Sequence, residues 1–171
     1  MPEFPEDAVD AILDQWKRQR PDLDLRAMGL FGRLGRVAAI GEKAVAEGLV
    51  KHRLNIGEFD VMAALRRAGP PYRLSPTELS RSLMLSSGAM TNRLDRLEEM
   101  GLVERLSDPD DRRALKVGLT RLGIVRVDAA VTDHVANEAR LLAPLSFTDQ
   151  KHLTELLRKL LAAWESRAPK E

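Results

Sequence analysis

The segment from Leu85 to Leu119 constrains the fold of this chain more than any other part of its sequence. It opens with Ser86 and Ser87, either of which can cap a helix because a serine hydroxyl accepts a hydrogen bond from a free backbone N–H. An apolar stripe at helical spacing follows, made of Met90, Leu94 and Leu97. Gly101 lies one residue past the last expected helical position, where a left-handed C-terminal cap needs a residue without Cβ. The segment therefore predicts a short helix that ends at this glycine.

Two short apolar runs come after this helix and predict a β-hairpin. The first run contains Leu102, Val103 and Leu106, and the second alternates through Leu115, Val117 and Leu119. Residues 107–113 between them read SDPDDRR, in which Asp-Pro favours a bend and aspartate favours local backbone hydrogen bonds. Residues 72–74 are a candidate third strand of the same small sheet.

A second capped helix precedes the first one. Residues 75–78 read SPTE, a capping box with proline at the first helical position, and Leu79 and Leu83 follow. Two capped helices with a short connection form a helix-turn-helix, and the hairpin adds a wing. The predicted fold class is mainly α with a small β-wing, a winged helix-turn-helix.

This arrangement indicates binding to double-stranded DNA. Small residues at the start of the helix that opens at Ser86 permit close approach to a duplex, and the polar residues after them can reach bases or phosphates. Two arginines at the hairpin tip can enter the minor groove. The predicted DNA-binding residues are Ser86, Ser87, Gly88, Ala89, Thr91, Asn92, Arg93, Arg96, Arg112 and Arg113. The alternative is an ordinary polar helix face and a solvated turn whose arginines pair with neighbouring aspartates.

The run from Asn55 to about Leu145 resembles the MarR family of winged helix-turn-helix transcription regulators. The similarity is carried by LSSGAMTNRLDRLEEMGLVER, by DPDDRRALKVGLT and by Gly123. The resemblance implies a homodimer that binds a pseudo-palindromic operator, and a small ligand that lowers its affinity for DNA. It also implies regulation of transcription in place of catalysis, with repression as the expected mode and activation as the alternative.

Helical patterns flank the winged segment, and we assign residues 1–171 to a single domain. The resemblance implies that residues 22–50 and 120–168, the N- and C-terminal helices, form a helical dimerisation region, and that residues 55–119 are the DNA-binding region. Asn55 and Thr120 are predicted caps, while Thr148 and Asp149 are expected to open the last helix. That helix has a wide apolar stripe, made of Leu153, Leu156, Leu157, Leu160, Leu161 and Trp164. An intrachain helical core is the alternative to a dimer contact.

Residues 6–21 form an added helix, with Val9, Ile12, Leu13 and Trp16 at helical spacing. Such a helix resembles the urate-responsive subfamily, whose ligand site combines a tryptophan, an aspartate and two arginines. The matching positions are Trp16, Asp60, Arg93 and Arg105. An indole offers a stacking face to a flat anion, and an arginine offers planar paired donors.

Three of these four residues also have a purely structural explanation. Trp16 can simply pack the added helix, Asp60 can pair with Arg66 or with a neighbouring helix, and Arg105 can touch phosphate beside the wing. Two alternatives therefore stay open. One is a MarR-like regulator that responds to another small anion or to none, and the other is a winged-helix protein-interaction module.

Charge and residue composition narrow the functions that the chain can have. The net charge is +1, so DNA binding must depend on local placement of arginines, Arg81 among them, and should weaken steeply with salt. The absence of cysteine excludes disulfides and thiol-based sensing. Three scattered histidines predict no metal site, and no catalytic motif or cofactor-binding loop is apparent, so the chain is not expected to be an enzyme. With no membrane span or secretion signal visible, we expect a cytoplasmic protein without a membrane partner.

Overall fold

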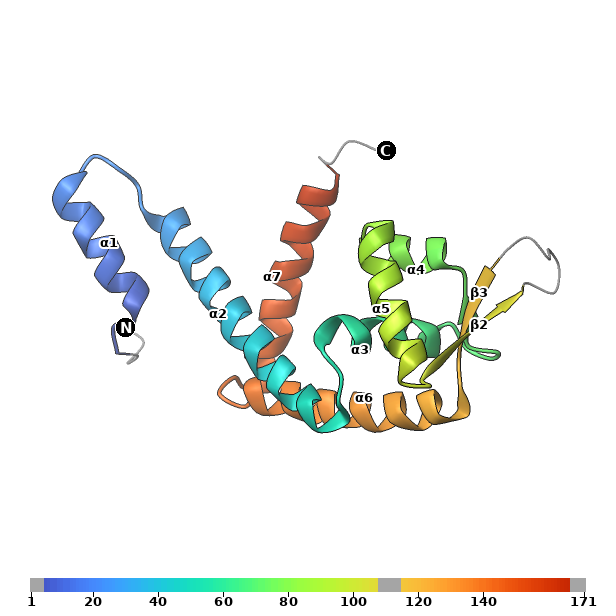
Figure 1. Ribbon diagram of the computed structural model, residues 1–171. Helices are drawn as coiled ribbons and strands as arrows, with labels where there is room; N and C mark the ends of the chain where they lie inside the picture. The colour runs from blue at the N-terminus through green and yellow to red at the C-terminus, as the bar shows by residue number, and fades with distance from the viewer. Residues whose placement is uncertain (1–4, 108–114, 167–171) are drawn as a thin grey trace. The chain divides into compact units, whose positions relative to one another are not determined.

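The computed structural model describes residues 5–107 and 115–166, and the chain divides into two compact units, residues 1–47 and 48–171 (Figure 1). The helices are α1 (Ala8–Gln19), α2 (Arg26–Leu49), α3 (Ile56–Arg67), α4 (Pro76–Ser82), α5 (Ser87–Glu99), α6 (Arg121–Leu141) and α7 (Phe147–Glu165). A 3-10 turn, η1 (Val50–His52), follows α2, and the strands are β1 (Arg73–Leu74), β2 (Val103–Ser107) and β3 (Leu115–Leu119). The predicted class, mainly α with a small β-wing, is confirmed.

The second unit contains the predicted helix-turn-helix and its wing. The sheet has the order β1-β3-β2, and both pairings are antiparallel. Val103 pairs with Leu119 at one end of the hairpin, and Ser107 pairs with Leu115 at the other. Arg73 pairs with Gly118, so the expected third strand is present. The predicted winged helix-turn-helix is therefore formed by α3 to β3.

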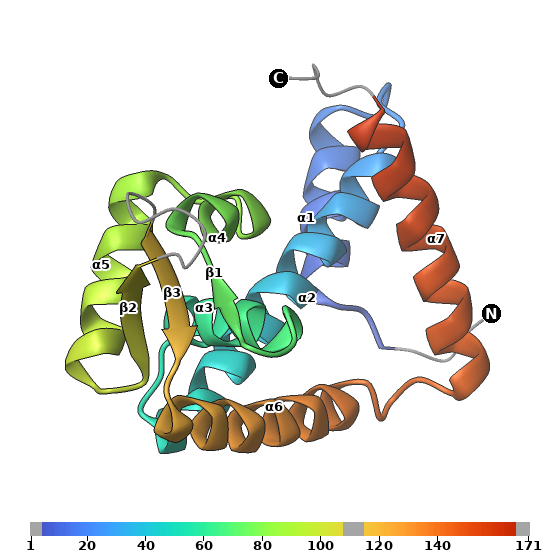
Figure 2. The same ribbon diagram turned by 90° about the vertical axis from the view of Figure 1, so that its right-hand side faces the viewer.

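Helix α3 occupies the centre of this unit. It contacts α4, α5, α6 and β3, and the views show α6 on one side of α3 with α4 and α5 on the other (Figures 1 and 2). Six of its apolar residues are buried: Phe59, Val61, Met62, Ala63, Ala64 and Leu65. The stripe predicted for α5 is buried as well, in the form of Met90, Leu94 and Leu97. Helix α5 is thus fixed by burial of its apolar face against the rest of the unit.

Local capping begins most of the helices where the sequence indicated. Asn55 and Ser75 form capping boxes, and Ser86 and Thr120 accept hydrogen bonds from N3 backbone N–H groups. Gly101 follows α5 with φ +67°, as the left-handed cap requires. The last helix is different from the prediction, because Ser146 caps α7 and the helix begins at Phe147.

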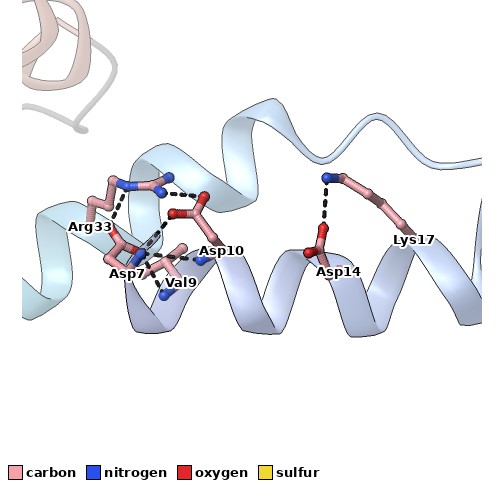
Figure 3. Close-up of polar contacts among 6 residues, drawn as sticks. All are labelled: Asp7, Val9, Asp10, Asp14, Lys17 and Arg33. Carbon is pink, nitrogen blue, oxygen red and sulfur yellow. Dashed lines mark hydrogen bonds and ion pairs between the residues drawn. The ribbon is translucent and has the colours of Figure 1, made fainter. Parts of the chain in front are cut away.

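The first unit consists of α1 and most of α2. The carboxylate of Asp7 caps α1, and Arg33 of α2 forms ion pairs with Asp7 and Asp10 at 2.8 and 2.6 Å (Figure 3). Val9 is buried, and one of its methyl groups would lie 3.0 Å from a Cβ at Gly32. Gly29 and Gly32 of α2 thus permit close packing of α1 against α2.

Candidate nucleic-acid interface and effector site

The first turns of α5 present an exposed polar surface. Ser86, Ser87, Gly88, Thr91 and Asn92 are all exposed, while Ala89 is half-buried. Ser86 Oγ accepts from the backbone N–H of Ala89 at 3.4 Å. Thr91 Oγ1 donates to the Ser87 carbonyl at 3.0 Å, so the hydroxyl proton is used within the helix and its oxygen is left to accept. The predicted helix surface is therefore accessible to a duplex, with Asn92 as its free amide.

Arg96 extends from the exposed side of α5 toward α3. Its Nε lies 3.0 Å from Oε1 of Glu58, in an ion pair that lacks hydrogen-bond alignment. The Glu58 side chain is only 2% exposed, whereas that of Arg96 is 65% exposed. Oε2 of the same carboxylate accepts from the Asn55 backbone N–H at 2.9 Å. One buried carboxylate thus both caps α3 and orients an arginine of α5.

Arg93 is half-buried between α5 and the N-terminal turn of α3. Its Nη1 donates to the Gly57 carbonyl at 3.5 Å. A Cβ placed at Gly57 would lie 2.5 Å from Arg93 Cζ, so only glycine leaves the guanidinium in this position. The side chain therefore reaches the neighbouring helix and does not extend fully into solvent.

Asp60 lies one turn along α3 from Gly57 and is also half-buried. Burial raises the pKa of its carboxyl above the ordinary value, while the positive charges of Arg93, Arg67 and His134 act in the opposite direction. No ion pair to Asp60 occurs within residues 5–107 and 115–166. The suggested partner Arg66 instead donates to Asp128 at 2.7 Å. Asp60 and Arg93 are thus electrostatically coupled without direct pairing.

Arg105 of β2 pairs with two carboxylates of α5. Its Nη2 donates to Asp95 at 2.5 Å, and its Nη1 pairs with Glu98. The hydrogen bond with Asp95 is the main reason that the pKa of the Arg105 guanidinium is raised. An anionic ligand that used Arg105 would have to compete with these two carboxylates.

The other predicted residues lie elsewhere. Trp16 is on α1, in the first compact unit, and its side chain is 43% exposed. Arg112 and Arg113, predicted at the hairpin tip, lie outside the described residues. Within the second unit the structure therefore brings together Asp60 and Arg93, and places Arg105 against α5.

Two residues of this region were not singled out for the site by the sequence. Gly57 supports Arg93, and Glu58 holds Arg96 in addition to capping α3. In the sequence, Glu58 stands three residues after the cap Asn55, and this spacing fully explains it as part of a capping box. It therefore gave no reason to expect a second role. Glycine in the first turn of an otherwise regular helix is the only signal that marks Gly57.

Comparison with known proteins assigns this geometry to a family. The sequence pattern that defines the MarR family matches residues 54–115, from just before α3 to the start of β3. The chain is 38% identical over 152 residues to the HTH-type transcriptional regulator PecS of Dickeya dadantii, covering 89% of this chain and 92% of that protein. The chain belongs to the MarR family.

Solved MarR-family structures share the fold. A mutant of MarR from Escherichia coli in complex with operator DNA has a TM-score of 0.70 at 28% identity, over 82% of this chain and 99% of that chain. AbsC of Streptomyces coelicolor has a TM-score of 0.73 at 20% identity, over 85% and 97% of the two chains, which supports the fold alone. Family membership makes this protein a DNA-binding transcriptional regulator and not an enzyme, and sets aside a purely protein-binding module.

No helix among residues 5–107 and 115–166 is long and apolar enough to cross a membrane. The same residues contain no group of three or more histidine or acidic side chains placed to hold a metal ion.

Proposed function

We propose that two copies of this MarR-family chain bind a pseudo-palindromic operator as a repressor, and that a small anion releases the DNA. The anion is urate or a related purine. The observation that carries the proposal is the position of Arg93, which belongs to the DNA-reading helix and lies next to the half-buried Asp60. A ligand that moves this arginine acts directly on the surface that contacts DNA.

DNA recognition depends on the exposed start of α5 and on the arginines around it. Asn92 can form paired hydrogen bonds to adenine, and Arg96 can contact guanine or phosphate. Because the whole chain carries a net charge of only +1, nonspecific attraction is weak and the local arginines determine the affinity. The hairpin arginines Arg112 and Arg113 are assigned to the minor groove from the sequence.

The proposed ligand chemistry follows from charge and shape. Urate is a flat anion at neutral pH, and the planar guanidinium of Arg93 offers it two parallel donors. The carboxylate of Asp60 repels an anion, so binding favours a state in which Arg93 has moved away from Asp60. Trp16 is assigned to the ligand from the sequence alone, as a stacking face, and Arg105 becomes a second donor once it leaves Asp95. The ligand thus selects a conformation that differs from the DNA-bound one.

Exposed apolar side chains support the homodimer. On α7, the side chains of Leu153, Leu156, Leu157, Leu161 and Trp164 are 37–53% exposed, and the helix has no buried residue. A continuous apolar stripe of this size in water marks an interaction surface. Assignment of the stripe to a second copy predicts that Leu157→Glu yields a monomer in analytical ultracentrifugation, whereas Lys159→Glu on the same helix leaves the dimer unchanged.

A gel shift tests the regulator and its ligand together. The DNA directly upstream of the gene that encodes this protein is titrated with protein, and preformed complex is then titrated with urate. A discrete complex that urate dissolves supports the proposal, and hypoxanthine, a neutral purine, should leave it intact. A complex indifferent to urate contradicts the urate assignment and leaves another small anion, or none, as the effector.

Direct titration of urate in the absence of DNA separates the proposed role of Arg93 in ligand binding from its proposed role in DNA binding. We expect Arg93→Ala to weaken urate binding about tenfold or more, since a charge-assisted hydrogen bond is lost. Arg121→Ala removes an exposed arginine of α6 and serves as the matched control. Equal urate affinity in wild type and Arg93→Ala would remove Arg93 from the effector site.

A further inference from the structure

We propose a second small-molecule site, distinct from the effector site, in a pocket between η1 and the N-terminal half of α6. The pocket has a volume of about 350 Å³. One wall is formed by the basic residues 51–53, and the other by one face of α6, made of Leu122, Val125, Arg126 and Ala129. These α6 positions are spaced i, i+3, i+4 and i+7, so they form a single stripe along the helix. The ligand class is an organic monoanion with an apolar body.

The charges of the pocket leave two guanidinium groups without a carboxylate. Lys51 Nζ and His52 Nε2 both lie 2.8 Å from Oδ2 of Asp133, and this pairing, with Lys51 as its main cause, lowers the pKa of Asp133. Within the described residues neither Arg53 nor Arg126 has an acidic partner. Three formal cations therefore face one carboxylate, and the excess positive charge attracts an anion.

Arg126 is also held in position. Its Nη1 donates to the His52 carbonyl at 2.9 Å, which fixes the guanidinium at the pocket while other N–H groups stay available. A planar guanidinium fixed in this way can donate two parallel hydrogen bonds to a carboxylate. Because the side chain is already ordered, binding costs less conformational entropy than it would for a free arginine.

The rest of the α6 wall is apolar and open to solvent. Leu122 is 50% exposed and Val125 is 64% exposed, and both lie on the same stripe as Arg126. Inorganic phosphate would leave these side chains in water, and a neutral apolar molecule would leave the guanidinium groups unused. A carboxylate attached to a ring or short apolar chain satisfies both surfaces, at the lower end of the size range for small-molecule pockets.

This pocket contains no residue of the proposed effector site. Asp60, Arg93 and Arg105 lie on α3, α5 and β2, whereas the pocket is formed by η1, Arg53 and α6. Its occupancy can therefore be measured independently of urate. The inference does not depend on urate being the effector.

Isothermal titration with 2-naphthoate, and with 2-naphthamide as the neutral isostere, tests the site on the full chain. We expect saturable binding of the naphthoate, and a drop of about tenfold in affinity for Arg126→Gln, because a charge-assisted pair is replaced by a neutral contact. Arg53→Gln should weaken binding by a smaller factor. Arg121→Gln removes the same charge from α6 outside the pocket and should bind as the wild type does, and Arg93→Ala should do so too.

Several results would overturn the proposal. One is the absence of saturable binding, and another is equal affinity for the naphthoate and the naphthamide. Loss of binding in Arg93→Ala with retention in Arg126→Gln would show that the probe occupies the effector site. A change from dimer to monomer in Val125→Asp would show that a second copy of the chain covers the pocket. Circular dichroism of Arg126→Gln confirms that any loss of binding occurs in a folded protein.

Discussion

The guanidinium of Arg93 lies against the backbone of Gly57, and a methyl group at Gly57 would lie 2.5 Å from Arg93 Cζ. The contact joins α3, the central helix of the winged unit, to α5, the proposed recognition helix. It explains how an arginine of α5 becomes half-buried within electrostatic reach of Asp60. The N-terminal turn of α3 is therefore a positioning element for the proposed DNA-binding surface.

Gly57→Ala should displace Arg93 while leaving the fold intact. The overlapping atoms belong to the end of a flexible side chain, and alanine is the better helix former, so the free energy of unfolding should change by less than about 1 kcal/mol. Urate affinity should drop severalfold, measured by calorimetry. Gly41→Ala, where nothing lies within 4 Å of the added methyl group, is the matched control. Unchanged urate binding in Gly57→Ala would show that the position of Arg93 does not matter to the ligand.

Glu58→Gln should uncouple Arg96 from α3. The amide retains an oxygen for the Asn55 backbone N–H but loses the ion pair to Arg96, and we expect a loss of about 1 kcal/mol in the free energy of unfolding. Urea denaturation of Glu58→Gln, Arg96→Gln and the double variant forms a mutant cycle. Additive effects of the two substitutions would mean that the ion pair contributes nothing to stability.

Local signals in the sequence were sufficient to predict the elements of the winged unit. Capping by Asn55, Ser75 and Thr120 depends on residues no more than three positions apart, and the structure confirms all three. The start of α7 was placed at Thr148 and Asp149 because both are good caps, but Ser146 takes that role and Asp149 completes the capping box from N3. Errors of one or two residues at helix ends are typical when several capping residues are adjacent.

Side-chain pairing across elements was much harder to predict. Arg105 was expected to bind ligand or phosphate, whereas it donates to Asp95 and pairs with Glu98 on α5. Glu98 and Asp95 are 7 and 10 residues away from Arg105 along the chain. Whether they reach it depends on the direction in which the chain continues from Gly101 into β2. The sequence names the charged residues but does not fix which of them meet, because that depends on the packing of α5 and β2.

Arg105→Gln should loosen the connection between the wing and the recognition helix. It leaves Asp95 and Glu98 without their shared cation, one helical turn apart on α5, where like charges repel. Since both carboxylates are partly exposed, the loss should be about 1 kcal/mol or less. Hydrogen exchange should quicken at β2 amides and stay unchanged in the α3 core. Equal protection of β2 in the two proteins would contradict a role for Arg105 in holding the wing.

Asp60→Asn should stabilise the protein at neutral pH. The pKa of Asp60 is raised by burial, so the folded state binds this proton more tightly than the unfolded state does, and stability declines as the pH rises through the folded pKa. Asparagine removes the cost of ionising a half-buried carboxyl. The gain in stability over the wild type should shrink as the pH falls and the wild-type carboxyl becomes protonated. Asp133→Asn should show the opposite sign, since the pKa of Asp133 is lowered and its stabilisation is present above the unfolded pKa. Thermal melts from pH 3 to pH 8, in steps of about one unit, measure both differences.

Val9→Ala should detach α1 from α2 more effectively than removal of the ion pairs shown in Figure 3. Val9 is 3% exposed and packs at Gly32, so truncation costs roughly 1–2 kcal/mol in the local stability of α1. Arg33→Gln breaks the contacts to Asp7 and Asp10, but all three side chains are at least one-third exposed, and such pairs contribute little in water. Hydrogen exchange of α1 amides should therefore accelerate strongly in Val9→Ala and slightly in Arg33→Gln. The reverse order would mean that charge pairing, and not apolar packing against the glycines of α2, holds α1 in place.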